Sequence, residues 1–167
     1  MSARFVNDSR GHSHYILHQE MSQSCGPACV AMVEGEYKQA CMVDGEARAR
    51  QLSQNYPDRF TETGGTGARN LAYVLNAEGV PCYASTGVGT KIFDYLYYYL
   101  SDRTKIICHI SWASGGGHFT VLSEIDSSHR MYFHDPWYDV VEVNRSSLPN
   151  YGVPGGTLSG WLTIPHR

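Results

Sequence analysis

The segment Gln19-Glu-Met-Ser-Gln-Ser-Cys25-Gly-Pro-Ala-Cys-Val-Ala-Met32 changes at Cys25 from polar residues to small and apolar ones. Pro27 favours the first turn of a helix, where the N–H that proline lacks would have no partner anyway. We therefore predict a buried central helix that begins at Cys25 and runs to about Gly35. The unpaired N–H groups and the dipole at a helix N-terminus stabilise an anion such as a thiolate. Cys25 is accordingly our candidate nucleophile.

The chain has 167 residues, of which 17% are charged, and a formal net charge of −3. This length predicts one domain whose core needs no metal or disulfide for support. The net charge and the lack of a lysine and arginine cluster argue against a nucleic-acid-binding protein. The five cysteines are odd in number and irregularly spaced, which fits neither a zinc site nor a disulfide framework. We expect no cofactor, no metal and a reducing compartment.

The first residues, Met-Ser-Ala-Arg-Phe-Val-Asn-Asp, lack the apolar stretch of a signal peptide. No apolar run approaches the length of about 18 residues that a membrane-spanning helix needs. We therefore expect a soluble protein that is cytoplasmic when made and does not bind a membrane. Residues 1–17 are predicted to form a polar arm or a first short strand, and residues 18–167 a single domain.

Hydrophobic periodicity and turn residues predict helices in the first two thirds of the chain and strands mainly in the last third. The expected helices cover 25–35, 46–56, 68–78 and 91–101. The expected strands cover 80–85, 105–112, 118–125, 130–135, 139–143 and 157–164. Helices followed by an antiparallel sheet define an α+β fold.

Two strands of this sheet carry candidate partners for the nucleophile. His118 follows three glycines at the start of one strand, and Asp135 precedes a proline at the end of the next. A turn of two or four residues would place Ile125 opposite Arg130 and Thr120 opposite Asp135. His118 and Asp135 would then share one face, within reach of a hydrogen bond. A turn of three residues would place them on opposite faces.

Acyl transfer needs a nucleophile, a base, a group that orients the base, and donors for the developing oxyanion. Cys25, His118 and Asp135 fit the first three roles. The backbone N–H of Cys25 fits the fourth, together with the side-chain amide of Gln19, six residues upstream. Gln23 is the rival for this amide, although it lies too close to Cys25 to fold back easily.

The pattern Gln-x5-Cys-Gly-Pro-Ala-Cys, then Gly-His-Phe-x-Val-Leu, then Asp-Pro resembles the papain-like cysteine peptidases. The nearest branch is the bacteriocin-processing (double-glycine leader) peptidase family. The resemblance implies a papain-like fold over residues 19–164, with a Cys-bearing helix packed on an antiparallel sheet. It also implies that Gln19 forms the oxyanion hole, Cys25 attacks, His118 acts as base and Asp135 orients it. The membrane spans and ATPase that commonly accompany that branch are lacking here.

The resemblance implies a cysteine endopeptidase that cleaves a protein or peptide. Similar free-standing domains occur as bacterial effectors and toxins, so we expect a secreted antibacterial or host-directed effector with a cognate immunity or inhibitor protein. Its delivery would not depend on a signal peptide. The alternatives are a glutamine deamidase or acyltransferase toxin with the same triad, and a non-catalytic module that binds a leader peptide.

Substrate contacts are expected from two residues near the candidate site. Gly117, the last of three consecutive glycines, would form a groove wall narrow enough to favour small residues before the cut. Trp137, which follows the Asp-Pro pair, would form another wall.

Several reactive residues have simpler interpretations. We expect core packing for the remaining cysteines, namely Cys29, Cys41, Cys82 and Cys108. His109 is expected to be a packed or surface histidine. His134 alternates with Asp135 and therefore points to the opposite face of the strand, where we expect it to be exposed to solvent. A metal site formed by His118, His134 and Asp135 would lack the spacing of zinc ligands.

Overall fold

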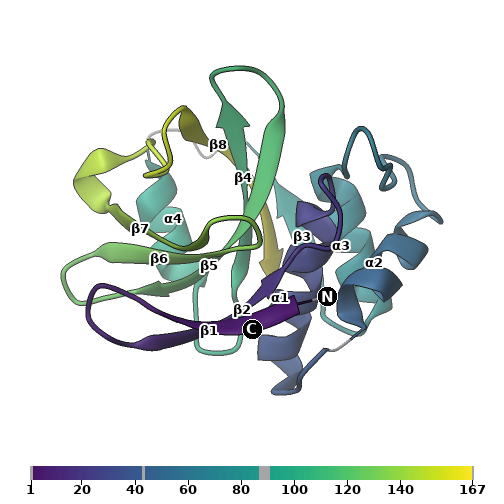
Figure 1. The fold of residues 1–167 in the computed structure, drawn as a ribbon, viewed down its shortest axis with the longest axis horizontal. Helices are drawn as coiled ribbons and strands as arrows, with labels where there is room; N and C mark the ends of the chain where they lie inside the picture. Colours follow the sequence, from purple (N-terminus) through teal and green to yellow (C-terminus); the bar gives the residue numbers. More distant parts are fainter. Residues whose placement is uncertain (1, 43, 87–90, 167) are drawn as a thin grey trace.

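The computed structural model describes residues 2–42, 44–86 and 91–166, in which a helical part lies beside an antiparallel sheet (Figure 1). The helical part contains α1 (Cys25–Lys38), α2 (Gly45–Ser53) and α3 (Ala68–Ala77). The six-stranded sheet has the order β3 (Cys82–Ser85), β8 (Gly156–Pro165), β4 (Ile106–Trp112), β5 (Gly117–Ile125), β6 (Arg130–Asp135) and β7 (Asp139–Asn144). The predicted α+β fold is confirmed.

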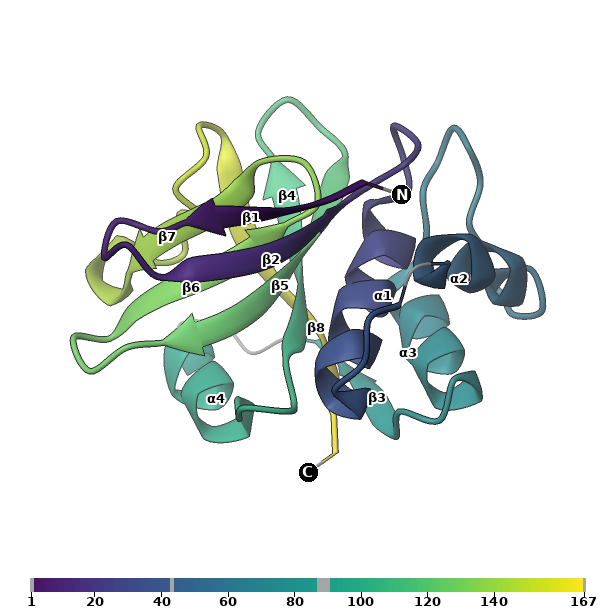
Figure 2. The same cartoon turned by 60° about the horizontal axis from the view of Figure 1, so that its bottom comes forward.

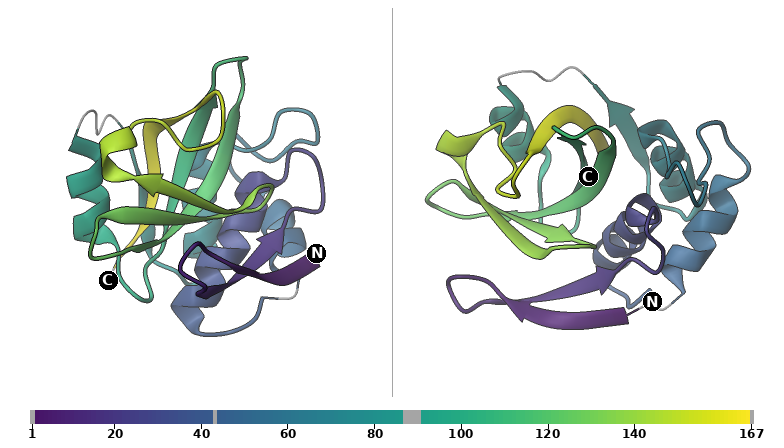
Figure 3. Two further views of the ribbon diagram at one scale, coloured as in Figure 1. Left: turned by 60° about the vertical axis from the view of Figure 1, so that its left-hand side comes forward. Right: turned by 45° about the horizontal axis from the view of Figure 1, so that its top comes forward.

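The predicted N-terminal arm is a β-hairpin of strands β1 (Ser2–Asn7) and β2 (Ser13–His18). It lies along β6 and β7 on the side of the sheet next to α1 (Figures 2 and 3). Charged contacts fix it there: Arg10 forms a bidentate ion pair with Glu124 at 2.8 Å, and Arg4 pairs with Asp139. The hairpin is therefore an integral cover of the sheet.

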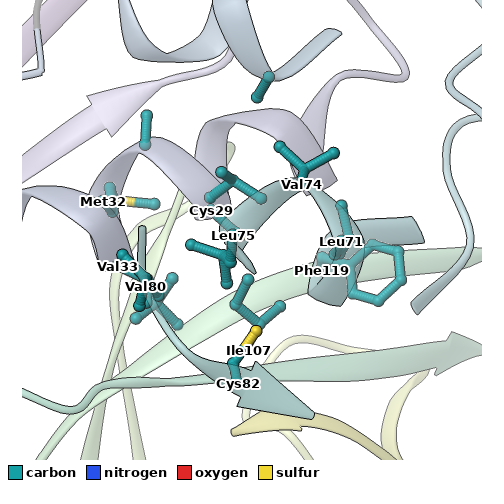
Figure 4. Close-up of a cluster of buried hydrophobic side chains, with 14 of the residues drawn as sticks. Cys29, Met32, Val33, Leu71, Val74, Leu75, Val80, Cys82, Ile107 and Phe119 are labelled. Carbon is teal, nitrogen blue, oxygen red and sulfur yellow. The ribbon is translucent and has the colours of Figure 1, made fainter. Parts of the chain in front are cut away.

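Two apolar clusters hold the layers together, one on each face of the sheet. The first joins α1 and α3 to the sheet through residues such as Val30, Leu75 and Phe119, and Figure 4 shows much of it. The second fills the space between the sheet and the short helix α4 (Ile92–Tyr99), with Leu96 and Phe133 among its buried members. The nucleophile candidate and its partners thus lie on elements whose opposite faces are anchored in a core.

Helix α1 begins at Cys25 as predicted, but it extends past Gly35 to Lys38. The helix ends where Gln39 adopts a left-handed conformation (φ 54°), and the Ala40 N–H then donates to the Gly35 carbonyl at 3.0 Å. A Cβ on Gly35 would lie 2.9 Å from the Ala40 oxygen. Glycine is therefore needed here so that the chain can fold back, and it does not terminate the helix.

None of the helices within 2–42, 44–86 and 91–166 is both long and apolar enough to cross a membrane.

The turn between β5 and β6 contains three residues, which by itself would have separated His118 and Asp135. Asp126 and Arg130 close the turn with a 3.0 Å backbone hydrogen bond, and Ile125 pairs with Met131, so the predicted pairing of Ile125 with Arg130 is wrong. A β-bulge between Leu122 and Glu124 supplies one extra residue in β5.

Beyond the bulge the register returns to Leu122 opposite Phe133 and Val121 opposite His134. This register places Thr120 at the level of Asp135, as predicted. Two departures from regular geometry, a turn of three residues and a bulge, cancel each other and restore the shared face.

Candidate active site

Cys25 occupies the first position of α1, where the backbone N–H groups of the first turn have no intrahelical partner. The N-terminus of this helix packs against the start of β5: a Cβ on Gly26 would lie 3.5 Å from the ring of Phe119. Gly26 and Pro27 are buried, whereas Cys25 is partly accessible. The thiol is thus presented at a helix N-terminus beside the strand that carries His118.

His118 and Asp135 form a buried pair on neighbouring strands. The imidazole Nε2 lies 2.9 Å from both carboxylate oxygens, and the two residues are 6% and 0% exposed. Cys25 is also near the ring, since its thiol is among the groups that raise the pKa of His118. The structure therefore brings the three predicted triad residues together.

Burial lowers the pKa of His118, because desolvation disfavours the charged imidazolium. Hydrogen bonds to Asp135 and Cys25, and the negative charge of these two groups, outweigh that penalty and raise the pKa to about 9. The imidazole is therefore protonated at neutral pH. An imidazolium beside a thiol at a helix N-terminus is the arrangement that activates cysteine nucleophiles.

Asp135 is held by donors other than His118. The backbone N–H groups of Trp137 and Tyr138 donate to its Oδ1 at 2.8 and 2.9 Å, and the Tyr151 hydroxyl lies 2.7 Å from its Oδ2. A fully buried carboxylate needs such partners to replace the hydrogen bonds that it loses with water. The side chains of Tyr151 and Thr120 contact each other. Sequence patterns predicted the place of Thr120 level with Asp135, but gave no sign of Tyr151, which belongs to a stretch without a recognisable motif.

Gln19 lies beside this pair because its backbone N–H donates to the Pro136 carbonyl at 3.1 Å. Its side-chain Nε2 donates to the carbonyls of Met21 and Ser22 at 2.7 and 2.9 Å. Both amide donors thus point into the loop that precedes Cys25. Its role in an oxyanion hole stays a prediction and requires the amide to turn away from these carbonyls.

Glu46 shapes the same loop from α2. Its buried carboxylate accepts the Glu20 N–H at 3.0 and 3.1 Å, and Arg50 approaches it at 3.1 Å. Burial raises the pKa of Glu46, while a hydrogen bond with Ser24 lowers it. The sequence gives no sign of this contact, since a glutamate in the first turn of a helix is usually exposed.

The two predicted groove residues are both linked to the buried pair, Gly117 as the neighbour of His118 in the chain and Trp137 through its backbone N–H to Asp135. Gly117 directly precedes His118, and a Cβ at this position would collide with the Nε2 atom of His109. His109 is fixed by Ser159, 2.8 Å from its Nδ1. Trp137 is 53% exposed and its ring remains available for contact.

A hollow of about 560 Å³ lies between the loop before α3 and the sheet. Its lining includes Gly65 and Trp161. Gly65 is close to the active-site loop, since a Cβ there would lie 3.5 Å from the Gln23 carbonyl oxygen. Trp161 lies 5.5 Å from His109 between ring centroids. The hollow therefore borders the candidate site and has the size of a site for a few residues of a peptide.

His134 points away from Asp135 as predicted, but it is buried (5% exposed), so its expected solvent exposure is wrong. The N-terminal hairpin covers it, and His14 lies 2.9 Å away between ring nitrogens. His134 and His118 consequently belong to different environments on opposite faces of the sheet.

The ligand atoms of Asp8, His14 and Glu124 lie within 4.8 Å of one another, as a metal site would require. The guanidinium of Arg10 pairs with both carboxylates of this group, at 2.6 and 2.8 Å. Arg10 thereby supplies the positive charge that a cation would bring.

The other cysteines differ in their environments. Cys29, Cys82 and Cys108 are buried in the core as predicted, and burial raises the pKa of each thiol. Cys41 is exposed after the end of α1, so its predicted place in the core is wrong. Cys25 differs from these four cysteines because its thiol lies at a helix N-terminus and beside the imidazole of His118.

Comparisons with known proteins agree with this geometry. Residues 13–150 match the family model of the peptidase C39 family. A double glycine motif protease from an AMS/PCAT transporter, solved in complex with the leader peptide, is similar in structure with a TM-score of 0.58 and 18% identity over 90% of this chain and 91% of that one. Pseudomonas avirulence protein AvrPphB is also similar, with a TM-score of 0.50 and 9% identity over 86% of this chain and 90% of that one.

No curated protein sequence gives a significant match. The structural likenesses confirm the papain-like fold, and the family match covers most of the chain, including Cys25, His118 and Asp135. The chain belongs to the peptidase C39 family and is a cysteine peptidase.

Proposed function

We propose that the protein is an endopeptidase that cleaves a protein or peptide substrate through Cys25, His118 and Asp135. The observation that carries the proposal is the buried His118–Asp135 pair, together with Cys25 at the start of α1, whose thiol is near enough to help raise the pKa of His118. The structural likeness to a protease solved with a leader peptide supports a peptide substrate.

In the proposed reaction the Cys25 thiolate attacks the carbonyl carbon of the scissile amide. The oxyanion is stabilised by the Cys25 N–H and by the Gln19 amide, once that amide has turned from the Met21 and Ser22 carbonyls. His118 donates its proton to the leaving amine, and the C–N bond breaks to give a thioester. Water activated by the now neutral His118 hydrolyses the thioester, while Asp135 keeps the ring oriented.

The walls of the groove support a preference for small residues before the cut. His109 already fills the space above Gly117, so a bulky side chain of the substrate has no room on that side. Trp137, whose backbone N–H donates to Asp135, offers an exposed aromatic ring near the pair. Cleavage after glycine or another small residue is therefore the proposed specificity.

We propose in addition that the enzyme acts as a secreted effector, delivered independently of a signal peptide and held in check by a cognate inhibitor. The structural likeness to an avirulence protein supports this role. Production of the enzyme inside target bacteria or host cells tests it: toxicity that depends on Cys25 would agree, and growth equal to that with Cys25→Ala would contradict it.

The test of the peptidase compares the native protein with Cys25→Ala in a bacterial lysate, with labelling of new protein N-termini and mass analysis of side chains. New N-termini that appear only with the native protein are expected, and the residues before each cut define the specificity. Mass gains of about one dalton on glutamine without cleavage would instead establish a deamidase, because the same triad can attack a side-chain amide.

A synthetic peptide library that contains Gly-Gly, Gly-Ala and bulky pairs complements the lysate, because it does not depend on the presence of a natural substrate. Failure to cleave any peptide, combined with binding of a leader peptide by the native protein and Cys25→Ala alike, would identify a binding module and contradict the proposal.

A further inference from the structure

We propose that Tyr151 is a positioning residue of the active site, which acts through Asp135 and, with Thr120, fixes the carboxylate that orients His118. The inference rests on the proposed roles of His118 and Asp135. The juxtaposition that carries it is a buried chain of contacts from Thr120 to Tyr151 to Asp135 to His118.

The hydroxyl of Tyr151 has two partners at short distance. Its oxygen lies 2.6 Å from the Thr120 Oγ1 and 2.7 Å from the Asp135 Oδ2. A tyrosine hydroxyl carries one proton, and an ionised carboxylate accepts but does not donate. Tyr151 therefore donates to Asp135. The Thr120 hydroxyl, which also lies 3.3 Å from the His134 carbonyl, is then assigned as the donor to the nearer Tyr151 oxygen at 2.6 Å.

This assignment gives each oxygen of Asp135 its own fixed donors. The N–H groups of Trp137 and Tyr138 hold Oδ1, whereas Oδ2 receives the Tyr151 hydroxyl. His118 Nε2 lies 2.9 Å from both oxygens. Without the hydroxyl, His118 would be the only partner of Oδ2 among these contacts, and the carboxylate plane would be free to tilt about its Oδ1 anchors.

Tyr151 is itself rigidly held, as a positioning residue must be. It is 0% exposed, and its ring packs edge-on against Phe133 with centroids 5.1 Å apart. Its backbone N–H donates to the Gly156 carbonyl at 3.0 Å, at the start of β8. Burial, reinforced by the charge of Asp135, raises the pKa of Tyr151 well above its usual value, so the hydroxyl keeps its proton over the working pH range.

Removal of the hydroxyl has a defined electrostatic consequence. A donor to a carboxylate stabilises its negative charge and weakens its pull on the proton of a neighbouring imidazolium. Tyr151→Phe should therefore raise the pKa of His118 while it loosens the geometry. The other titratable groups that face the pair are Cys25 and Cys29 from α1, His109 from β4 and the nearby Tyr138, and Tyr151→Phe replaces none of these residues.

The first measurement is an NMR titration of the His118 ring in full-length Cys25→Ala protein, with and without Tyr151→Phe. It needs no catalytic activity, so its outcome is independent of whether the peptidase proposal holds. A higher pKa of His118 in the double variant is expected. An unchanged pKa would overturn the inference.

The matched control is Tyr132→Phe, because Tyr132 is also a buried tyrosine on this sheet and donates to the Asp126 carboxylate at 2.8 Å, remote from the site. Both variants lose one buried hydrogen bond to a carboxylate, and only Tyr151→Phe should move the His118 titration. Equal titrations in the two would show that Tyr151 serves folding alone.

The second measurement is peptidase kinetics on folded protein. Tyr151→Phe should lower kcat roughly 10-fold with little change in KM, on the order of one hydrogen bond to a charged group. Thr120→Val should reproduce part of this loss, and Thr120→Ser, which keeps the hydroxyl, should restore it. Losses that match Tyr132→Phe, or a Thr120→Ser variant as impaired as Thr120→Val, would contradict the proposed chain.

Discussion

The two faces of the β5–β6 ribbon each bury a histidine. At neutral pH one of these imidazole rings is protonated and the other is neutral. His118 is 6% exposed and His134 is 5% exposed, so burial alone does not distinguish them. On one face, Asp135 and Cys25 overcome desolvation and raise the pKa of His118 to about 9. On the other face, burial together with repulsion from His14 and Lys105 lowers the pKa of His134 to about 3.

The neighbours of the two rings explain this difference. His134 and Asp135 are adjacent in sequence, and the alternation of a strand sends one to the hairpin side and the other to the active site. Under the hairpin the negative charge of Asp8 is already neutralised by Arg10, and their hydrogen bonds lower the pKa of Asp8 in spite of its burial. A buried imidazole is thus charged where a carboxylate faces it and neutral where a second imidazole does.

The most disruptive test of this comparison changes the adjacent residues separately. Asp135→Asn should lower kcat by about 10²- to 10⁴-fold, because the imidazolium loses its stabilising negative charge and the ring loses the carboxylate that orients it. His134→Gln should leave kcat within about twofold, because its ring faces the hairpin and not the site. Steady-state kinetics with a cleaved peptide would measure both, and equal losses would contradict the separation of the two faces.

The next effect concerns stability on the alkaline side. The raised pKa of His118 means that the folded protein binds this proton more tightly than the unfolded chain, in which histidine has a pKa near 6.5. The stabilisation is complete below about pH 6.5 and is lost as the pH rises through about 9. It amounts to about 3 kcal/mol.

Urea unfolding of the native protein and of Asp135→Asn between pH 6 and pH 10 would detect the stabilisation that comes from the protonation of His118. The difference between their free energies of unfolding should shrink as the pH rises. A difference that stays constant over this range would show that His118 does not gain its proton from Asp135.

His134 produces the reverse dependence on the acid side. In the unfolded chain His134 binds a proton below about pH 6.5, whereas in the folded chain it binds one only below about pH 3. The free energy of unfolding therefore falls as the pH decreases through this interval. At pH 5 the loss is about 2 kcal/mol. His134→Gln should reduce this dependence of stability on pH, because a side-chain amide does not bind a proton in this range. Thermal unfolding of both proteins at pH 7 and pH 5 would measure the difference. Identical slopes in both proteins would contradict the assignment.

The smallest effect compares exposed aromatic rings on the two sides. Trp137 lies next to the candidate site and is 53% exposed, whereas Phe5 lies on the hairpin and is 73% exposed. Trp137→Ala should raise KM about threefold through lost contact with a peptide, which corresponds to a small part of one buried side chain. Phe5→Ala serves as the control and should leave KM unchanged. A larger increase in KM for Phe5→Ala than for Trp137→Ala would indicate that the peptide binds on the face covered by the hairpin.

Much of this architecture follows from local sequence patterns. Pro27 places the start of α1, and alternation in the sheet predicts which strand residues share a face. The register between β5 and β6 was harder to predict, because a turn of three residues and a bulge near Ser123 both depart from the simplest hairpin. Their effects cancel, so the predicted alignment of Thr120 with Asp135 is right even though the predicted pairing of Ile125 is wrong.

Two contacts between distant segments could not be predicted from the sequence. The burial of His134 depends on the hairpin folding over it, and the Tyr151 contact depends on a loop that follows the sheet strands. Strand alternation predicts the face of His134 but not what covers that face, and Tyr151 belongs to no motif, so only tertiary structure reveals the partner of each residue. The role of Gln19 was predicted from its spacing to Cys25, but spacing does not fix where a side-chain amide points.

Strand β8 comes last among the strands in sequence, yet it lies inside the sheet between β3 and β4. On the ribosome, residues 25–38 emerge long before 156–165, so the nascent chain exposes its nucleophile well before the sheet can close. Pairings between such distant segments form late in folding. Tyr151, whose backbone is tied to the start of β8, adopts its place only at that stage. The site is therefore completed only after β8 has emerged and paired, and the peptidase remains inactive until that stage.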